Sequence, residues 1–396
     1  MAVTVLLVRL VDEWASFLPA ATFDSFRADL GLTYRGAALA LLAIGPGAIV
    51  GSAVTVLADT RSRRVLAAGG ALVYAAALAL FAAATSSWML VVGGVGVGLG
   101  ATLLVDTVEV ALADLCPDTD ALERALARMN VAAGVGDLTG PLLVAGAAAL
   151  GWSWRVPLVI TAAATAAYGV LIACTPLPAP RSPELVGPDV APPHPARDVL
   201  MLLRRTELWW AGACGALLVG LDESFIAFVI AYLRRDDGTS DAAATLIAAV
   251  FVIGGLFAAV RLARGERGAR GARGARAGNF RGALRAAAIT MVAGAVALAT
   301  VPSPGVVAIS GFAIGAGTIA FWVPFHAAML RLVPGRAASV SAVVGTIEMT
   351  GLAIAPLIGA VSDAWGLHAG LVVYALLPIA LAVLAGVTPA VLERCG

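Results

Sequence analysis

The chain has 396 residues, of which 60% are hydrophobic and only 13% are charged, and its formal net charge is +1. A soluble domain of this length carries about a quarter charged residues, so the composition excludes an ordinary globular domain and predicts a polytopic membrane protein. The net charge identifies no partner, and the four scattered cysteines lack the spacing of a disulfide framework or a zinc site.

Twelve segments are long and apolar enough to cross a bilayer as helices. In chain order they are 2–22, 37–57, 65–85, 88–113, 126–150, 156–175, 208–232, 242–262, 284–301, 305–330, 338–362 and 367–390. The proline-rich stretch PLPAPRSPELVGPDVAPPHPARD between the sixth and seventh segments reads as a linker. The sequence therefore predicts an N-terminal six-helix bundle over 1–175, a cytoplasmic linker over 176–206 and a C-terminal six-helix bundle over 207–396.

The placement of arginine predicts the orientation. With a cytoplasmic N-terminus, the cytoplasmic loops, linker and C-terminus hold all but six of the 26 basic residues. The basic loop 264–282 then lies near anionic headgroups, and we do not expect it to bind nucleic acid. Every basic residue except the three histidines is Arg, which is typical of GC-rich coding, so we expect a bacterial plasma or inner membrane.

The two halves repeat one another at an offset of about 210 residues. LVDEWASF (10–17) aligns with GLDESFIAF (220–228), and GVGDLTG (134–140) with GTIEMTG (345–351). Segment 93–117 aligns with 310–334, which pairs Gly98 with Gly315 and Gly100 with Gly317. This duplication predicts an all-α membrane protein built as two pseudo-symmetric six-helix bundles around a central cavity.

Acidic residues inside the spans are the strongest functional signal. An ionisable group near the bilayer centre costs at least about 2.5–3.5 kcal/mol, so these groups must face a wet cavity, pair with one another or carry a proton. They are Asp12, Glu13, Asp106, Glu109, Asp137, Asp222, Glu223 and Glu348, and away from the span ends the possible cations that stand against them are Arg9 and His326.

Helical spacing limits how these groups pair. Arg9 is three residues from Asp12 and four from Glu13, so it can reach either carboxylate. We expect Arg9 to hold one acid and leave the other for function, and His326 to accept a proton or to pair with an acid. Trp14, Phe225 and Trp322 supply apolar or cation–π surface. The structural alternative, in which the acids are simply locked to arginines or helix ends, stays open.

Two motifs resemble the major facilitator superfamily. The loop TVLADTRSRR (55–64) is similar to its conserved loop signature, and the resemblance implies a gating role for Asp59, Arg63 and Arg64. GDLTGP (136–141) resembles the helix-5 signature of its proton-coupled exporters through Gly136, Gly140 and Pro141, which would form a helix bend. The resemblance implies the major facilitator fold, with helices 1, 4, 7 and 10 lining the cavity.

These observations favour a secondary transporter that exports hydrophobic or cationic small molecules in exchange for protons. A divalent metal-ion transporter of the same fold is the first alternative, and a non-transporting receptor or a lipid-translocating protein is the second. No phosphate-binding loop or catalytic constellation appears, so we expect neither an enzyme nor a cofactor nor a resident metal. We expect a monomer whose partners are its substrate, protons and the lipid bilayer.

Overall fold

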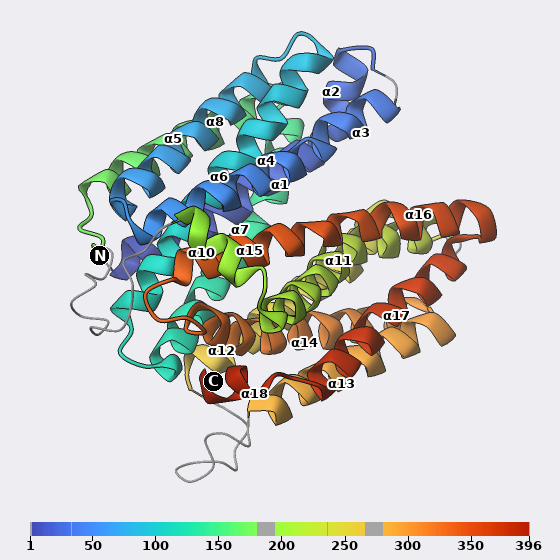
Figure 1. Ribbon diagram of the computed structural model, residues 1–396. Coiled ribbons are helices and arrows are strands. Elements are labelled where there is room, and N and C mark those ends of the chain that lie inside the picture. The colour runs from blue at the N-terminus through green and yellow to red at the C-terminus, as the bar shows by residue number, and fades with distance from the viewer. Residues whose placement is uncertain (1, 33, 180–194, 236, 266–279, 396) are drawn as a thin grey trace, which may run out of the picture. The chain divides into compact units, whose positions relative to one another are not determined.

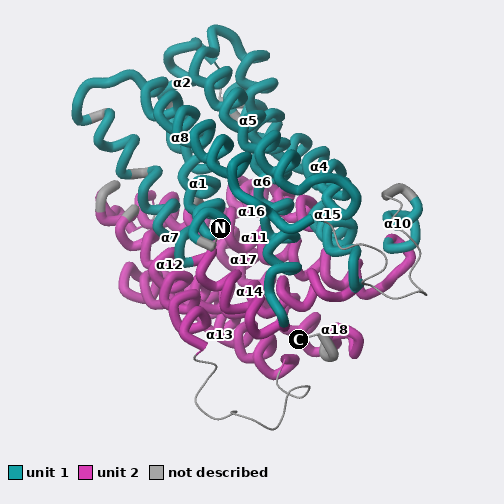
Figure 2. The backbone as a smooth tube through the Cα atoms, turned by 90° about the vertical axis from the view of Figure 1, so that its left-hand side faces the viewer, with its two compact units in different colours: residues 1–117, 131–202, 333–346 teal, residues 118–130, 203–332, 347–396 magenta. Residues whose placement is uncertain are grey.

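The computed structural model describes residues 2–32, 34–179, 195–235, 237–265 and 280–395. Within these ranges every regular element is a helix (Figure 1). Most of the predicted linker and of the predicted basic loop, namely 180–194 and 266–279, lies outside the described residues. The described chain divides into two compact units (Figure 2).

The first unit comprises residues 1–117, 131–202 and 333–346. Its helices are α1 (Ala2–Ala21), α2 (Phe23–Asp29), α3 (Tyr34–Leu42), α4 (Ile44–Thr55), the 3₁₀ helix η1 (Val56–Asp59), α5 (Arg63–Ala82), α6 (Ser87–Leu115), α8 (Arg155–Cys174) and α10 (Pro195–Leu202). It also holds most of α7 (Thr119–Ala149) and of α15 (Ala337–Glu348).

The second unit comprises residues 118–130, 203–332 and 347–396. Its helices are α11 (Thr206–Arg235), α12 (Asp241–Ala263), α13 (Phe280–Thr300), α14 (Pro304–Leu330), the 3₁₀ helix η2 (Met349–Ala353), α16 (Ile354–Trp365), α17 (Leu367–Gly386) and α18 (Ala390–Cys395). The two units are not continuous in sequence, since residues 118–130 belong to the second unit and residues 333–346 to the first. The bundles expected from the sequence, in contrast, are each one continuous stretch of chain.

Each of the twelve predicted spans coincides with a helix or a run of consecutive helices. Ten described segments are long and apolar enough to cross a membrane, judged by length and composition. The helix α1 is not among the ten, because Arg9, Asp12 and Glu13 all fall in any 18-residue window of it. The prediction of an all-helical membrane protein is confirmed.

Two predicted spans are interrupted helices. The span predicted at 37–57 is formed by α3, α4 and η1, and the span predicted at 338–362 by α15, η2 and α16. The break between α3 and α4 lies close to Pro46, and η2 ends close to Pro356. Proline lacks the N–H group that an α-helix requires, so it accounts for these two interruptions of a continuous apolar run.

The glycines aligned by the internal repeat make the same helix contacts in each unit. A side chain on Gly98 of α6 would collide with the Ile44 carbonyl in α4, and one on Gly315 of α14 with the Phe251 carbonyl in α12. In the same way Gly100 abuts the backbone of α5, and Gly317 abuts α13. Small residues let helix backbones approach closely, so α6 and α14 hold equivalent central positions within their own units.

Candidate functional site

The central feature of the first unit is a group of charged side chains that we call the Arg9 cluster: Arg9, Asp12, Glu13 and Glu109. Arg9 Nη2 lies 2.8 Å from Oε1 of Glu109, and its Nε lies 3.1 Å from the same oxygen. Its Nη1 lies 3.5 Å from Asp12 Oδ2 and 3.4 Å from Glu13 Oε1. One guanidinium group thus contacts three carboxyl groups, and its shortest contact reaches across to another helix.

Exposure separates the three acids. The Glu109 side chain is 4% exposed, Asp12 is 11% exposed and Glu13 is 28% exposed. Glu109 is therefore enclosed by protein and fixed by two donors, whereas Glu13 makes one longer contact and is the most accessible acid of the cluster. Asp106 lies one turn before Glu109 on α6, is half-buried, and interacts electrostatically with Glu109 and Arg9.

Neighbouring helices hold α1 in place around the cluster. Tyr74 of α5 donates a hydrogen bond to the Asp12 carbonyl oxygen at 3.3 Å. On α7, a Cβ atom on Gly136 would lie 2.6 Å from the Leu10 carbonyl oxygen and 3.0 Å from Glu13 Cβ. Gly136 therefore permits the close approach of α7 to the helix turn that carries Glu13.

The second glycine of the predicted α7 signature, Gly140, also lies against α1. A Cβ atom on Gly140 would lie 3.0 Å from Phe17 Cδ1, so this glycine also faces α1. The side chain of Pro141 lies outside the described residues. Asp137, which lies between these two glycines in the sequence, is half-buried. Trp14 is half-buried, and its Nε1 has no hydrogen-bond partner among the described residues.

In the second unit the aligned acidic pair has different surroundings. Asp222 and Glu223 are both exposed on α11, whereas Asp12 is buried and Glu13 half-buried. The adjacent Phe225 is buried and stacks on Phe251, with ring centroids 4.8 Å apart. The repeat therefore preserves the position of the acids in the sequence but not their burial.

The remaining predicted residues of this unit lie on α14 and at the end of α15. His326 is 5% exposed and stacks on Trp322 at 4.7 Å between ring centroids. Glu348 is buried, and its side chain fills the space beside Gly215 of α11, where any larger residue would collide with it. His326 and Glu348 are thus both buried within the second unit.

The predicted gating loop contains a compact polar site. Asp59 is 5% exposed and accepts hydrogen bonds from Ala338 N at 3.1 Å, Ser339 N at 2.9 Å and Ser339 Oγ at 2.6 Å. It thus caps the first turn of α15, where unpaired amides and the helix dipole favour a carboxylate.

The two arginines of the loop differ. Arg63 is buried and donates to the Ala58 carbonyl oxygen at 3.1 Å, and its Nη1 lies 2.6 Å from Asp114 Oδ2. Arg64 is exposed. The loop acid therefore binds backbone amides of α15, and the loop arginine binds an acid at the end of α6.

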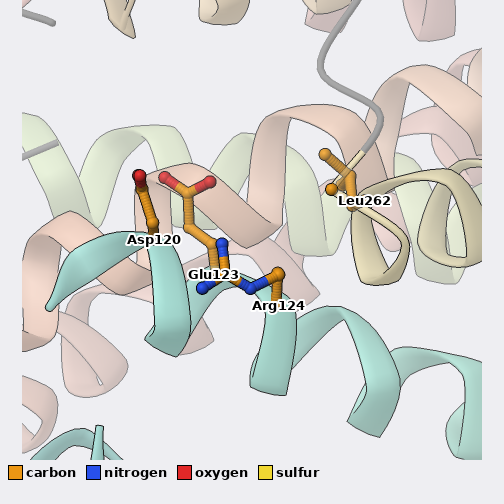
Figure 3. Close-up of a pocket in the computed structure, with 5 residues that line it drawn as sticks. Asp120, Glu123, Arg124 and Leu262 are labelled. Atoms are coloured by element: carbon orange, nitrogen blue, oxygen red, sulfur yellow. The ribbon is translucent and has the colours of Figure 1, made fainter. Parts of the chain in front are cut away.

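A small open pocket of about 100 Å³ lies in the second unit and contains no predicted site residue. Its lining is Asp120, Glu123 and Arg124 from α7 with Leu262 and Gly265 after α12. Figure 3 shows the side chains of Asp120 and Glu123 pointing the same way. Among the residues that the structure describes, no group of three His, Cys, Asp or Glu side chains has the arrangement of a metal site.

Ten described segments that are long and apolar enough to cross a membrane define a multi-pass membrane protein. Residues 5–273, more than half of the chain, match the family model of the Major Facilitator Superfamily. The chain therefore belongs to this superfamily of non-enzymatic secondary transporters. No curated protein matches the sequence significantly.

Solved structures of low sequence identity share the fold. FucP, the E. coli fucose:proton symporter, in its outward conformation is 17% identical, with 98% of each chain covered and a TM-score of 0.76. The human organic anion transporter MFSD10 is 16% identical, with 97% of this chain and 98% of that chain covered and a TM-score of 0.71. A bacterial homologue of the iron transporter ferroportin is 14% identical, with 98% of each chain covered and a TM-score of 0.76.

Proposed function

We propose that this transporter exports hydrophobic or cationic small molecules in exchange for protons, by alternating access. The observation that carries the proposal is the Arg9 cluster, in which three carboxyl groups contact one guanidinium group. An excess of acidic groups within apolar helices is costly unless a proton or another cation joins them. A cationic substrate and a proton would then compete for the same carboxylates, which is the basis of antiport.

We assign different roles to the acids of the cluster. Glu109 is the anchor, because it is nearly inaccessible and accepts two hydrogen bonds from Arg9. Glu13 is the exchangeable acid, because it is the most exposed and makes a single contact of 3.4 Å. Asp12 is intermediate in exposure, its contact with Arg9 is 3.5 Å long, and its carbonyl oxygen accepts a hydrogen bond from Tyr74. Protonation or cation binding at Glu13 would leave the Arg9–Glu109 pair intact.

The Asp59 site supports a gating role for the loop. Its carboxylate holds the first turn of α15 through three hydrogen bonds, and breaking them would free the start of that helix. Consistent with the arginine distribution, we propose a bacterial plasma or inner membrane with both termini in the cytoplasm, and a monomeric transporter.

Proton release from reconstituted liposomes tests the function. A pH-sensitive dye should report proton release when tetraphenylphosphonium is added to the native protein, and Glu13→Gln should abolish that release. Glu207→Gln, a half-buried acid at the start of α11, is the matched control and should behave as the native protein does.

The same assay discriminates the alternatives. Release with Mn²⁺, Fe²⁺ or Zn²⁺ but with no lipophilic cation would replace the proposal with a metal-ion transporter. Absence of proton and substrate movement under every gradient would overturn both transport proposals. Normal coupling in Glu13→Gln together with lost coupling in Asp12→Asn would reverse the roles assigned to these two acids.

A further inference from the structure

The short helix α10, which precedes the second half of the chain, has two distinct faces. Asp198 is 3% exposed and Leu202 is 4% exposed, and their spacing of four residues places them on one side of the helix. Leu200 is 64% exposed and Met201 is 48% exposed, and Arg197 is exposed one turn before Met201. One face therefore packs on the protein, and the other presents apolar side chains beside an arginine.

The inner face of α10 is fixed to the first unit by an ion pair. Asp198 contacts Arg336, which directly precedes α15 and is 8% exposed. The start of α15 is the turn that Asp59 caps. A buried charge pair specifies orientation, because rotating α10 would break the contact between Asp198 and Arg336 inside the protein. Leu200 and Met201 are consequently held on the outer side.

The composition of the outer face fits a membrane surface. Exposed apolar side chains next to arginine are typical of a helix that lies in the headgroup region, with its apolar residues at the acyl boundary. The sequence continues with two further exposed arginines, Arg204 and Arg205, and the candidate membrane span Thr206–Arg235 begins at the next residue. Each basic residue that lies at an anionic membrane surface attracts that surface, so these arginines favour anionic lipid.

We propose that the outer face of α10 binds the anionic phospholipid surface of the protein's own membrane. Leu200 and Met201 enter the acyl boundary, and Arg197 contacts phosphate groups. A zwitterionic surface offers the same apolar boundary without the net negative charge, so the interaction is stronger in anionic bilayers. This surface is separate from the Arg9 cluster, and its existence does not depend on the transported substrate.

Depth-dependent quenching tests this proposal on the full chain. A fluorophore is attached to a Leu200→Cys variant in which Cys116, Cys174 and Cys395 are replaced by alanine, while Cys214 is fully buried and is retained. The protein is reconstituted in phosphatidylglycerol-containing or pure phosphatidylcholine vesicles that carry spin-labelled lipid. Stronger quenching is expected in the anionic vesicles. A Met201→Cys variant provides an independent label site.

Removal of one arginine supplies the decisive comparison. Arg197→Gln should lower the apparent membrane partition of the label by about fivefold, the effect of one basic residue at an anionic surface. Arg128→Gln, which removes an exposed arginine on α7, is the matched control and should change nothing. A label that is unquenched in both lipids faces water or a soluble partner and overturns the proposal. Equal quenching in both lipids and in Arg197→Gln overturns the assignment of an anionic partner.

Discussion

Neutralising Glu109 and neutralising Glu13 should have very different effects on stability, although both acids contact Arg9. Glu109 is 4% exposed, and Arg9 reaches it at 2.8 and 3.1 Å. Removing one partner of a buried ion pair costs about 3–5 kcal/mol. Because Arg9 keeps Asp12 and Glu13 nearby, we expect Glu109→Gln to lower the free energy of unfolding by about 3 kcal/mol, the lower end of that range.

Glu13 is 28% exposed, and its one contact with Arg9 is 3.4 Å long. Partly solvated pairs of this kind contribute about 1 kcal/mol or less. Glu13→Gln should therefore destabilise the protein by about 2 kcal/mol less than Glu109→Gln does. Unfolding in mixed micelles, followed by tryptophan fluorescence over a denaturing-detergent titration, measures both values against the native protein.

A double-mutant cycle provides the control for this comparison. Replacing both partners in Arg9→Gln/Glu109→Gln should cost less than the sum of the two single variants, because neither member of the pair then stays charged without the other. The loss of the Arg9 contacts with Asp12 and Glu13 is already contained in the Arg9→Gln single variant. If Glu13→Gln destabilises as much as Glu109→Gln, or if the double variant is strictly additive, the assignment of Glu109 as anchor is refuted.

Three further substitutions test the surroundings of the site by the same unfolding titration. Gly136→Ala should cost about 1–3 kcal/mol, because its Cβ would lie 2.6 Å from the Leu10 carbonyl oxygen; native-like stability would contradict the close packing of α7 on α1. Asp59→Ala should cost about 1–2 kcal/mol through loss of the α15 cap, and Asp59→Asn should cost less than Asp59→Ala. If Asp59→Asn has the stability of the native protein, the charge of Asp59 has no role in the cap. Arg155→Gln should cost at most about 1 kcal/mol despite its 2.5 Å contact with Asp29, because both side chains are solvent-accessible; a loss near that of Glu109→Gln would refute this.

The local part of the candidate site followed from helical spacing. Arg9, Asp12 and Glu13 lie on consecutive turns of one apolar segment, so their proximity was predictable before any tertiary contact was known. The Arg9–Glu109 pair was not predictable in this way, because 100 residues separate its members and the apolar pattern of a span does not identify its neighbour. The same holds for Asp59 and Ser339, which are 280 positions apart.

The internal repeat illustrates the division between sequence and structure. Aligned glycines on α6 and α14 make the same packing contacts, because close backbone approach depends only on the absence of a side chain. The aligned acids do not share an environment, since Asp12 is buried and Asp222 is exposed. Burial of a charge depends on what the other helices bring to it, and a repeat does not encode that.

Hydropathy alone determined that this is a membrane protein and where its twelve helical segments lie, because the bilayer admits a chain of this composition only as apolar helices of a certain length. Tertiary structure decided which acid Arg9 holds most closely, which acid of the Asp12–Glu13 pair is accessible, and that Asp59 caps α15. The physical reason is that charges inside an apolar unit find their partners across helices, and those distances are fixed only when the helices pack.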